Sequence, residues 1–151
     1  MANKALLVDL DKTIRDTTEP DGHLTRLKTQ FIMPKRIEIL TKYKQQGYKI
    51  IGVTNAGFRS DGLSPPHVTI ESIHAIQQET LELLKGLLDA IIYSPLGISP
   101  RRKPDPEMLL IAIRDHDIDK SQCMMIGDSW KDLLAAEAVG IPHMHPDQFF
   151  S

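Results

Sequence analysis

Short apolar runs alternate with longer amphipathic segments along this chain, and this alternation constrains the fold more than any other feature. The expected strands cover residues 5–8, 48–55, 90–93, 123–127 and 141–145. The expected helices cover residues 34–47, 69–86, 107–115 and 133–140. Because strands that are separated by helices usually pair in parallel and are covered by those helices, the pattern predicts an α/β fold with a mostly parallel sheet.

The segment 69–86 carries the clearest helix pattern. It opens on Thr69, a residue type that caps helix N-termini. Apolar residues then recur at helical spacing, at Ile70, Ile73, Ile76, Leu84 and Leu88. This stripe predicts one apolar face. Earlier in the chain, residues 15–30 are rich in Thr, Asp, Glu, Pro and Gly, and they predict a long loop or flap.

Length and charge narrow the class of protein. The 151 residues suit a single domain over 1–151, and the formal net charge of −2 gives no electrostatic reason to expect a nucleic-acid or membrane surface. The one cysteine, Cys123, cannot form an internal disulfide. The first apolar run is too short for a signal peptide or a membrane span. We therefore expect a cytoplasmic protein without a membrane partner.

Polar side chains end three of the expected strands. Asp9 and Asp11 follow the first strand, Thr54 and Asn55 end the second, and Asp128 follows the fourth. In parallel α/β sheets, ligands bind beyond the carboxyl ends of the strands. We therefore expect these side chains to share one edge of the sheet.

These residue types suit the chemistry of phosphate esters. A carboxylate such as Asp9 can act as a nucleophile, and Asp11 can protonate a leaving oxygen and later take a proton from water. Oxygen ligands from Asp9 and Asp128 suit Mg²⁺. Thr54 offers a hydroxyl and Lys103 a positive charge, which phosphoryl transfer requires on the equatorial oxygens.

Four motifs in a fixed order resemble those of the haloacid-dehalogenase superfamily of phosphatases. They are Asp-Leu-Asp-Lys-Thr at 9–13, Val-Thr-Asn at 53–55, Arg-Arg-Lys-Pro at 101–104 and Gly-Asp-Ser-Trp-Lys-Asp at 127–132. The resemblance covers essentially the whole chain. It implies a Rossmann-like three-layer fold and Mg²⁺-dependent hydrolysis of phosphate monoesters.

The resemblance also implies a role for each matching residue. Asp9 matches the nucleophile that becomes aspartyl-phosphate, and Asp11 matches the general acid and base, with its backbone carbonyl on the metal. Thr54 and Lys103 match the residues that hold the phosphate. Asp128 matches the third metal ligand.

Other residues have supporting roles or open alternatives. By the resemblance, Asp132 supports the motif lysine or the waters on the metal; the alternative is a plain surface acid. Asn55, Arg59 and Arg102 are candidate substrate contacts, and for the two arginines an ordinary exposed position is the alternative. His23, in the loop after the first motif, is a further candidate for the pocket wall.

The order of motifs is most similar to the group that contains histidinol-phosphate phosphatase, heptose-bisphosphate phosphatase and the phosphatase domain of polynucleotide kinase-phosphatase. The gaps between motifs leave no room for a large cap domain, so we expect an open site. Heptose-bisphosphate phosphatases hold a structural zinc with three Cys and one His in the loop before the motif lysine. The equivalent residues 93–104 contain neither Cys nor His. Because structural zinc needs four ligands, we predict no zinc.

Several functions stay open at this level. The expected substrate is a small phosphorylated metabolite, such as a sugar phosphate or histidinol phosphate. A nucleic-acid 3′-phosphate is possible for an open site but is not favoured by the charge of −2 and the aromatic content of 5%. Two alternatives of another class are a phospho-aspartate signalling module and a non-catalytic phosphate-binding protein. We expect a monomer or a weak oligomer.

Some residues have simple structural explanations. Asp128 can cap the helix that follows it, with or without a metal. His143 and His145 alternate on an expected strand, and core or rim positions explain them better than a metal pair. Packing is the simplest explanation for Trp130 and for Phe149–Phe150.

Overall fold

The computed structural model describes residues 2–56, 65–94 and 101–151. A five-stranded sheet has the order β5-β4-β1-β6-β7, and all neighbouring strands are parallel. The strands of this sheet are β1 (Asn3–Val8), β4 (Lys49–Thr54), β5 (Ala90–Tyr93), β6 (Ile118–Ile126) and β7 (His143–Met144). The helices are α1 (Pro34–Gln45), α2 (Ile70–Leu83), α3 (Glu107–Asp115), α4 (Trp130–Val139) and α5 (Pro146–Phe149).

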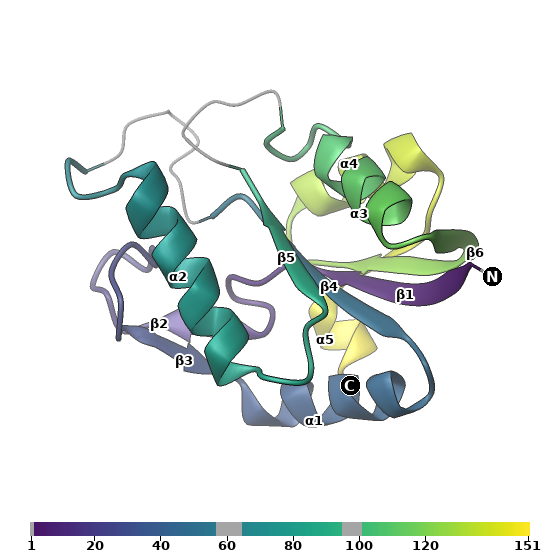
Figure 1. The fold of residues 1–151 in the computed structure, drawn as a ribbon, viewed down its shortest axis with the longest axis horizontal. Coiled ribbons are helices and arrows are strands. Elements are labelled where there is room, and N and C mark those ends of the chain that lie inside the picture. Colours follow the sequence, from purple (N-terminus) through teal and green to yellow (C-terminus); the bar gives the residue numbers. More distant parts are fainter. Residues whose placement is uncertain (1, 57–64, 95–100) are drawn as a thin grey trace.

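Helices cover both faces of this sheet (Figure 1). Helices α3 and α4 lie above it in that view, and α1 and α5 lie below it. Alternate side chains of β1 therefore enter two cores: Leu7 packs with Met125 under α3 and α4, whereas Leu6 packs with Ile126 and with Leu40 of α1. The predicted three-layer α/β fold with a mostly parallel sheet is confirmed.

The prediction of a loop over residues 15–30 was wrong at both ends. Strands β2 (Arg15–Thr17) and β3 (Gln30–Ile32) pair antiparallel as a small separate sheet. They lie beside α2, where the side-chain amide of Gln30 donates to Glu79 over 2.7 Å. Two strands of three residues, mostly polar, carry too little periodicity to be recognised locally.

The other differences concern the ends of elements. β6 begins at Ile118, which pairs with Asn3, and an irregularity in the ladder separates this pair from the next one, Ala5 with Cys123. The expected strand 141–145 shrinks to β7, and α5 was not expected.

Helix α4 begins three residues earlier than expected, because Ser129 caps it. The Ser129 hydroxyl accepts from the Lys131 amide, and Asp132 accepts from the Ser129 amide over 3.3 Å. Ser129 is therefore the cap, and the alternative that Asp128 occupies this position was wrong.

Candidate active site

A cavity of about 520 Å³ opens at the carboxyl ends of β1, β4 and β6. The sequence-predicted residues that line it are Asp9, Asp11, His23, Thr54, Asn55, Lys103, Asp128 and Asp132. Arg102 is absent from the lining, and its guanidinium lies 3.3 Å from the backbone oxygen of Asn55. Arg59 lies outside the described residues. The structure thus brings residues from five segments of the chain into one cavity.

Asp9 is held rigidly at the end of β1. Its amide donates to the Ile126 carbonyl over 2.8 Å, and the residue is 8% exposed. One carboxylate oxygen lies 3.1 Å from Lys103 Nζ, and the other accepts from the Thr13 hydroxyl over 3.3 Å. Burial raises the pKa of Asp9 to about 7, with a smaller contribution from the Asp132 charge and against the opposing charge of Lys103.

Lys103 is the buried cation of the site, with 3% of its surface exposed. Its Nζ donates to Asp9 over 3.1 Å, to Asp132 over 2.6 Å and to the Val53 carbonyl over 2.8 Å. Burial alone would lower the pKa of Lys103, but the two carboxylates outweigh it and raise this pKa above its usual value. Lys103 therefore stays charged in a place where an isolated ammonium would be very costly.

The side chain of Asn55 fixes the backbone of this lysine. Its Oδ1 accepts from the Lys103 amide over 2.9 Å, and its Nδ2 donates to the Lys103 carbonyl over 3.2 Å. Both polar atoms of this predicted substrate contact are thus bonded to the main chain of Lys103.

Asp11 is hydrogen-bonded to Arg15 and Thr54. Its Oδ1 accepts from Arg15 Nε over 3.0 Å, and its Oδ2 accepts from the Thr54 hydroxyl over 3.1 Å. The Thr54 oxygen in turn accepts from the Ala56 amide. Burial alone would raise the pKa of Asp11, but the Arg15 guanidinium and the Thr54 hydroxyl hold it below its usual value.

Three carboxylates converge at the end of the sheet. Asp9, Asp128 and Asp132 each place an oxygen within 4.8 Å of the others, the one such acidic group found among the described residues. Asp132 is 1% exposed and is bonded to Lys103, whereas Asp128 is exposed. Of these two, Asp128 is therefore better placed to offer an oxygen ligand to a hard cation beside Asp9.

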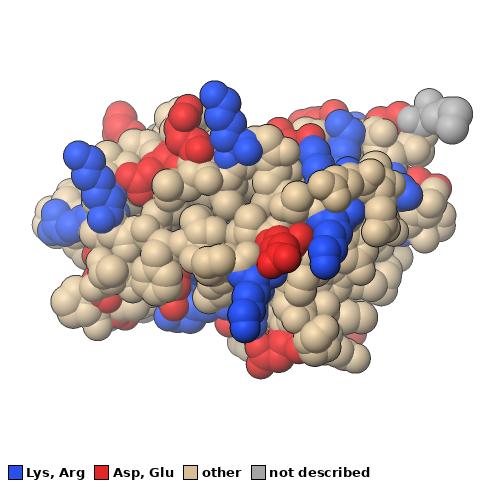
Figure 2. Space-filling model, turned by 90° about the horizontal axis from the view of Figure 1, so that it is seen from below, with Lys and Arg blue, Asp and Glu red and all other residues tan. Residues whose placement is uncertain are grey.

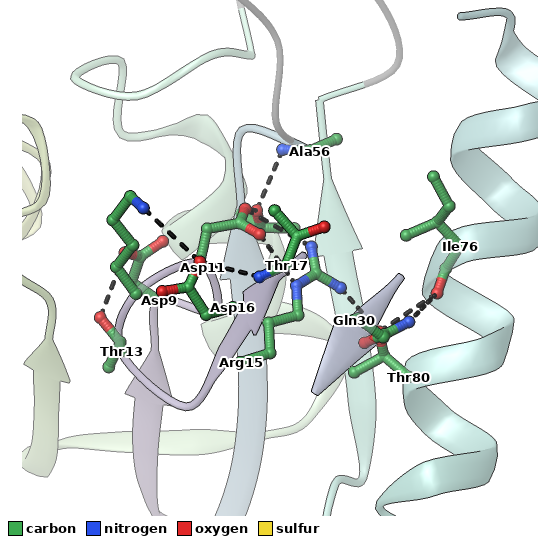
Figure 3. Close-up of polar contacts among 12 residues, drawn as sticks. Asp9, Asp11, Thr13, Arg15, Asp16, Thr17, Gln30, Ala56, Ile76 and Thr80 are labelled. Carbon is green, nitrogen blue, oxygen red and sulfur yellow. Dashed lines mark hydrogen bonds and ion pairs between the residues drawn. The ribbon is translucent and has the colours of Figure 1, made fainter. Parts of the chain in front are cut away.

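Sequence reasoning missed Arg15, a fully buried residue that contacts Asp11 (Figure 3). The sequence pattern that could have indicated a buried polar partner is the apolar stripe of α2. Its buried side chains are Ile73, Ile76, Gln77 and Thr80, so two of the four are polar. Polar side chains on the buried face of an amphipathic helix need a buried partner.

Three structural explanations can be compared with the structure. Trp130 is 61% exposed, so the packing prediction for it was wrong. Phe149 does pack, with its ring centroid 5.2 Å from that of Tyr43. His143 lies 2.8 Å from the Gly127 carbonyl, and His145 caps α5. These two contacts agree with structural roles for both histidines.

Within the described parts of the chain, no helix combines the length and the apolar character needed to cross a membrane.

Comparison with known proteins adds a family and several relatives. The family model for haloacid dehalogenase-like hydrolases matches residues 2–140. A D-glycero-beta-D-manno-heptose-1,7-bisphosphate 7-phosphatase of Helicobacter pylori is 33% identical over 141 residues, covering 88% of this chain and 77% of the relative. The histidine biosynthesis bifunctional protein of Campylobacter jejuni is 28% identical over 149 residues. That match covers 93% of this chain, which spans only 41% of the Campylobacter protein.

Several solved structures carry a similar fold, among them a heptose-bisphosphate phosphatase. The D,D-heptose 1,7-bisphosphate phosphatase of B. bronchiseptica, complexed with magnesium and phosphate, superposes with a TM-score of 0.70 at 24% identity. The superposition covers 93% of this chain and 78% of that structure.

Proposed function

Because the chain belongs to the haloacid dehalogenase-like hydrolase family, we propose that it hydrolyses the phosphate monoester of a small metabolite with the help of Mg²⁺. The observation that carries this proposal is the placement of Asp9 and Asp11 in one cavity, with the buried cation Lys103 bonded to Asp9. A carboxylate aimed at a cavity and flanked by a proton carrier and a fixed positive charge suits nucleophilic attack on phosphorus.

In the first step, a carboxylate oxygen of Asp9 attacks phosphorus and the bond from phosphorus to the leaving oxygen breaks. Asp11 takes up a proton before this step, against the preference for its ionised form that Arg15 and Thr54 impose. It then donates this proton to the leaving oxygen, so an alcohol departs and Asp9 carries the phosphoryl group. Lys103 and Thr13 fix the two oxygens of Asp9 before the reaction, which reduces the cost of orienting the nucleophile.

In the second step, water attacks the phosphorus of aspartyl-phosphate, and the bond between Asp9 and phosphorus breaks. Asp11 takes the proton from this water, and inorganic phosphate leaves. The contact with Arg15 favours the ionised form of Asp11, which is the form that accepts a proton.

The donor set of the site fits Mg²⁺. The Asp9 and Asp128 carboxylates, with the backbone carbonyl of Asp11, would hold the ion. When bound, it would neutralise charge on the phosphate oxygens and reduce repulsion between the acids. We retain the prediction that structural zinc is not required, because residues 93–104 contain neither Cys nor His.

We propose a sugar phosphate as the substrate class, because the Helicobacter relative is a heptose-bisphosphate phosphatase. Histidinol phosphate remains a second member of the test panel, since the Campylobacter relative serves histidine biosynthesis. On the face shown in Figure 2, basic and acidic side chains of the described residues are interspersed. The described residues on this face therefore form no broad basic surface of the kind that binds nucleic acids.

Phosphate release from a panel of esters tests this function directly. The panel contains sugar mono- and bisphosphates, histidinol phosphate, nucleotides and a 3′-phosphorylated oligonucleotide. We expect one small ester to be preferred with Mg²⁺, and release to fall about 100-fold or more in EDTA, because a metal supplies several kcal/mol of charge stabilisation. Restoring Mg²⁺ must restore the rate. Undiminished release in EDTA would exclude the metal, and no release from any ester would exclude the function.

Gly127→Ala is expected to lower kcat/KM by about 100-fold, as displacement of a site group by about 1 Å can do. A Cβ at Gly127 would overlap the carboxylate of Asp132, which holds Lys103. Gly86→Ala is the matched control, since Gly86 has a φ of +84° but open space around it. It should lose about 1–2 kcal/mol of stability and keep its activity. Equal kcat/KM values for the two variants would contradict the role given to Asp132.

A further inference from the structure

Arg15 is a buried arginine whose charged head faces a residue of the site. The residue is 0% exposed, although it stands at the first position of the short strand β2. Its Nε donates to Asp11 Oδ1 over 3.0 Å, and Nη2 lies 3.5 Å from Asp11 Oδ2. Two donors of one planar group therefore address both oxygens of one carboxylate, a geometry that restricts rotation of that carboxylate.

The other end of the guanidinium is anchored to a distant helix. Nη1 donates to the Gln77 side chain over 2.9 Å and to the Thr80 hydroxyl over 2.7 Å, both on α2. The Thr80 hydroxyl also lies 2.7 Å from Gln30 of β3, which closes the network (Figure 3). The side chain of Arg15, which belongs to β2, thus connects Asp11 to α2.

Fold stability alone gives a weak reason for this arrangement. Taking a guanidinium out of water is costly, and apolar residues of similar volume often stabilise a protein as well as a buried ion pair does. The carboxylate that Arg15 contacts is the one assigned to move protons, and it also accepts from Thr54. The planar guanidinium of an arginine holds the Asp11 carboxylate in one orientation, because two of its nitrogens contact the two oxygens. A flexible lysine with a single charged nitrogen does not restrict the carboxylate in this way.

We propose that Arg15 is a positioning residue, which holds the Asp11 carboxylate in the orientation that delivers a proton to the leaving oxygen. Gln77 and Thr80 of α2 are the fixed support from which Arg15 acts. This inference rests on the proposed function, since it presupposes that Asp11 is the proton donor. It adds that α2, which contributes no residue to the cavity lining, sets the geometry of that donor.

Two substrates with different leaving groups separate this role from a structural one. An aryl phosphate such as p-nitrophenyl phosphate releases a stable anion and needs little help from an acid. An alkyl phosphate releases an oxygen that must be protonated, and the probe is the alkyl ester with the highest kcat/KM in the panel. kcat/KM covers the steps up to departure of the leaving group. The ratio of the two kcat/KM values therefore measures how much the general acid contributes to the reaction.

For Arg15→Met we expect kcat/KM to fall about 100-fold on the alkyl ester and less than about 5-fold on the aryl ester, since a positioned acid contributes about 10²–10⁴-fold. Arg15→Lys should recover part of the alkyl activity. Thr80→Val keeps the contact with Asp11 and loosens the support, so it should shift the ratio in the same direction by about 3-fold. It also tests the inference if Arg15→Met does not fold.

Arg36→Met is the matched control. Arg36 donates to the Thr13 carbonyl over 3.0 Å, so it holds the same loop without touching a carboxylate of the cavity. The ratio should not change in this variant. Equal losses on both esters in the Arg15 variants, or an unchanged ratio in Thr80→Val and Arg15→Lys, would overturn the inference. A wild-type protein that hydrolyses neither ester would instead refute the proposed function.

Discussion

Replacing Asp9 by asparagine should abolish phosphate release while the protein stays folded. We expect kcat/KM to fall by about 10⁴-fold or more, as it does when an enzyme loses its nucleophile. The reason is chemical, because an amide oxygen carries no charge and attacks phosphorus poorly. The shape of the side chain is unchanged, and the amide oxygen can still accept from Lys103 Nζ, which lies 3.1 Å from Asp9 Oδ1.

The measurement is phosphate release from the preferred ester at saturating Mg²⁺, with circular dichroism to establish folding. Asp16→Asn is the control, because Asp16 is a nearby carboxylate that pairs with Lys12 on the surface and does not line the cavity. Its kcat/KM should stay within about 2-fold of the wild-type value, since surface ion pairs contribute little. Near-wild-type hydrolysis by Asp9→Asn would remove Asp9 from the role of nucleophile.

Replacing Lys103 by methionine should lower the free energy of unfolding by about 3–5 kcal/mol, as breaking a buried ion pair does. The substitution leaves the buried carboxylates of Asp9 and Asp132 without their shared cation. The same change should abolish turnover, because the fixed positive charge beside the nucleophile is lost. Stability is measured by urea unfolding in EDTA at pH 8, above the pKa of about 7 to which burial raises Asp9 in the wild-type protein.

Two comparisons make this prediction specific. Lys44→Met breaks the partly exposed ion pair between Lys44 and Asp89, and it should cost less than about 1 kcal/mol. Adding Asp132→Asn to Lys103→Met should recover part of the lost stability, because it removes the buried Asp132 carboxylate that has lost its cation. If Lys103→Met cost no more than Lys44→Met, the buried cation would not be needed to hold the acids together.

The parallel sheet and the polar residues at its edge could be predicted from local sequence patterns. Apolar runs of four to eight residues between amphipathic helices predict parallel strands, and the residue that follows such a strand is thereby placed at one edge. The positions of Asp9, Thr54 and Asp128 at the ends of strands predict that all three lie at this edge. The structure brings all three to the same cavity. Their chemical roles stay proposals until the variants are measured.

Contacts between distant segments could not be read in this way. Arg15 and Gln77 are 62 positions apart in the sequence, and Asn55 and Lys103 are 48 positions apart. No local sequence pattern therefore predicts either contact. The β2–β3 pair is likewise visible only once both strands lie beside α2. The exposure of Trp130 depends on how α4 turns on the sheet.

The sequence by itself determined which residues end the central strands, because strand periodicity and the order of motifs are local properties of the chain. Only the tertiary structure decided how those residues are held. Asp11 is oriented by Arg15, and Arg15 by Gln77 and Thr80, through hydrogen bonds whose partners meet after the chain has folded. A buried polar group must find a partner, but which partner it finds depends on the packing of α2 against the β2–β3 pair.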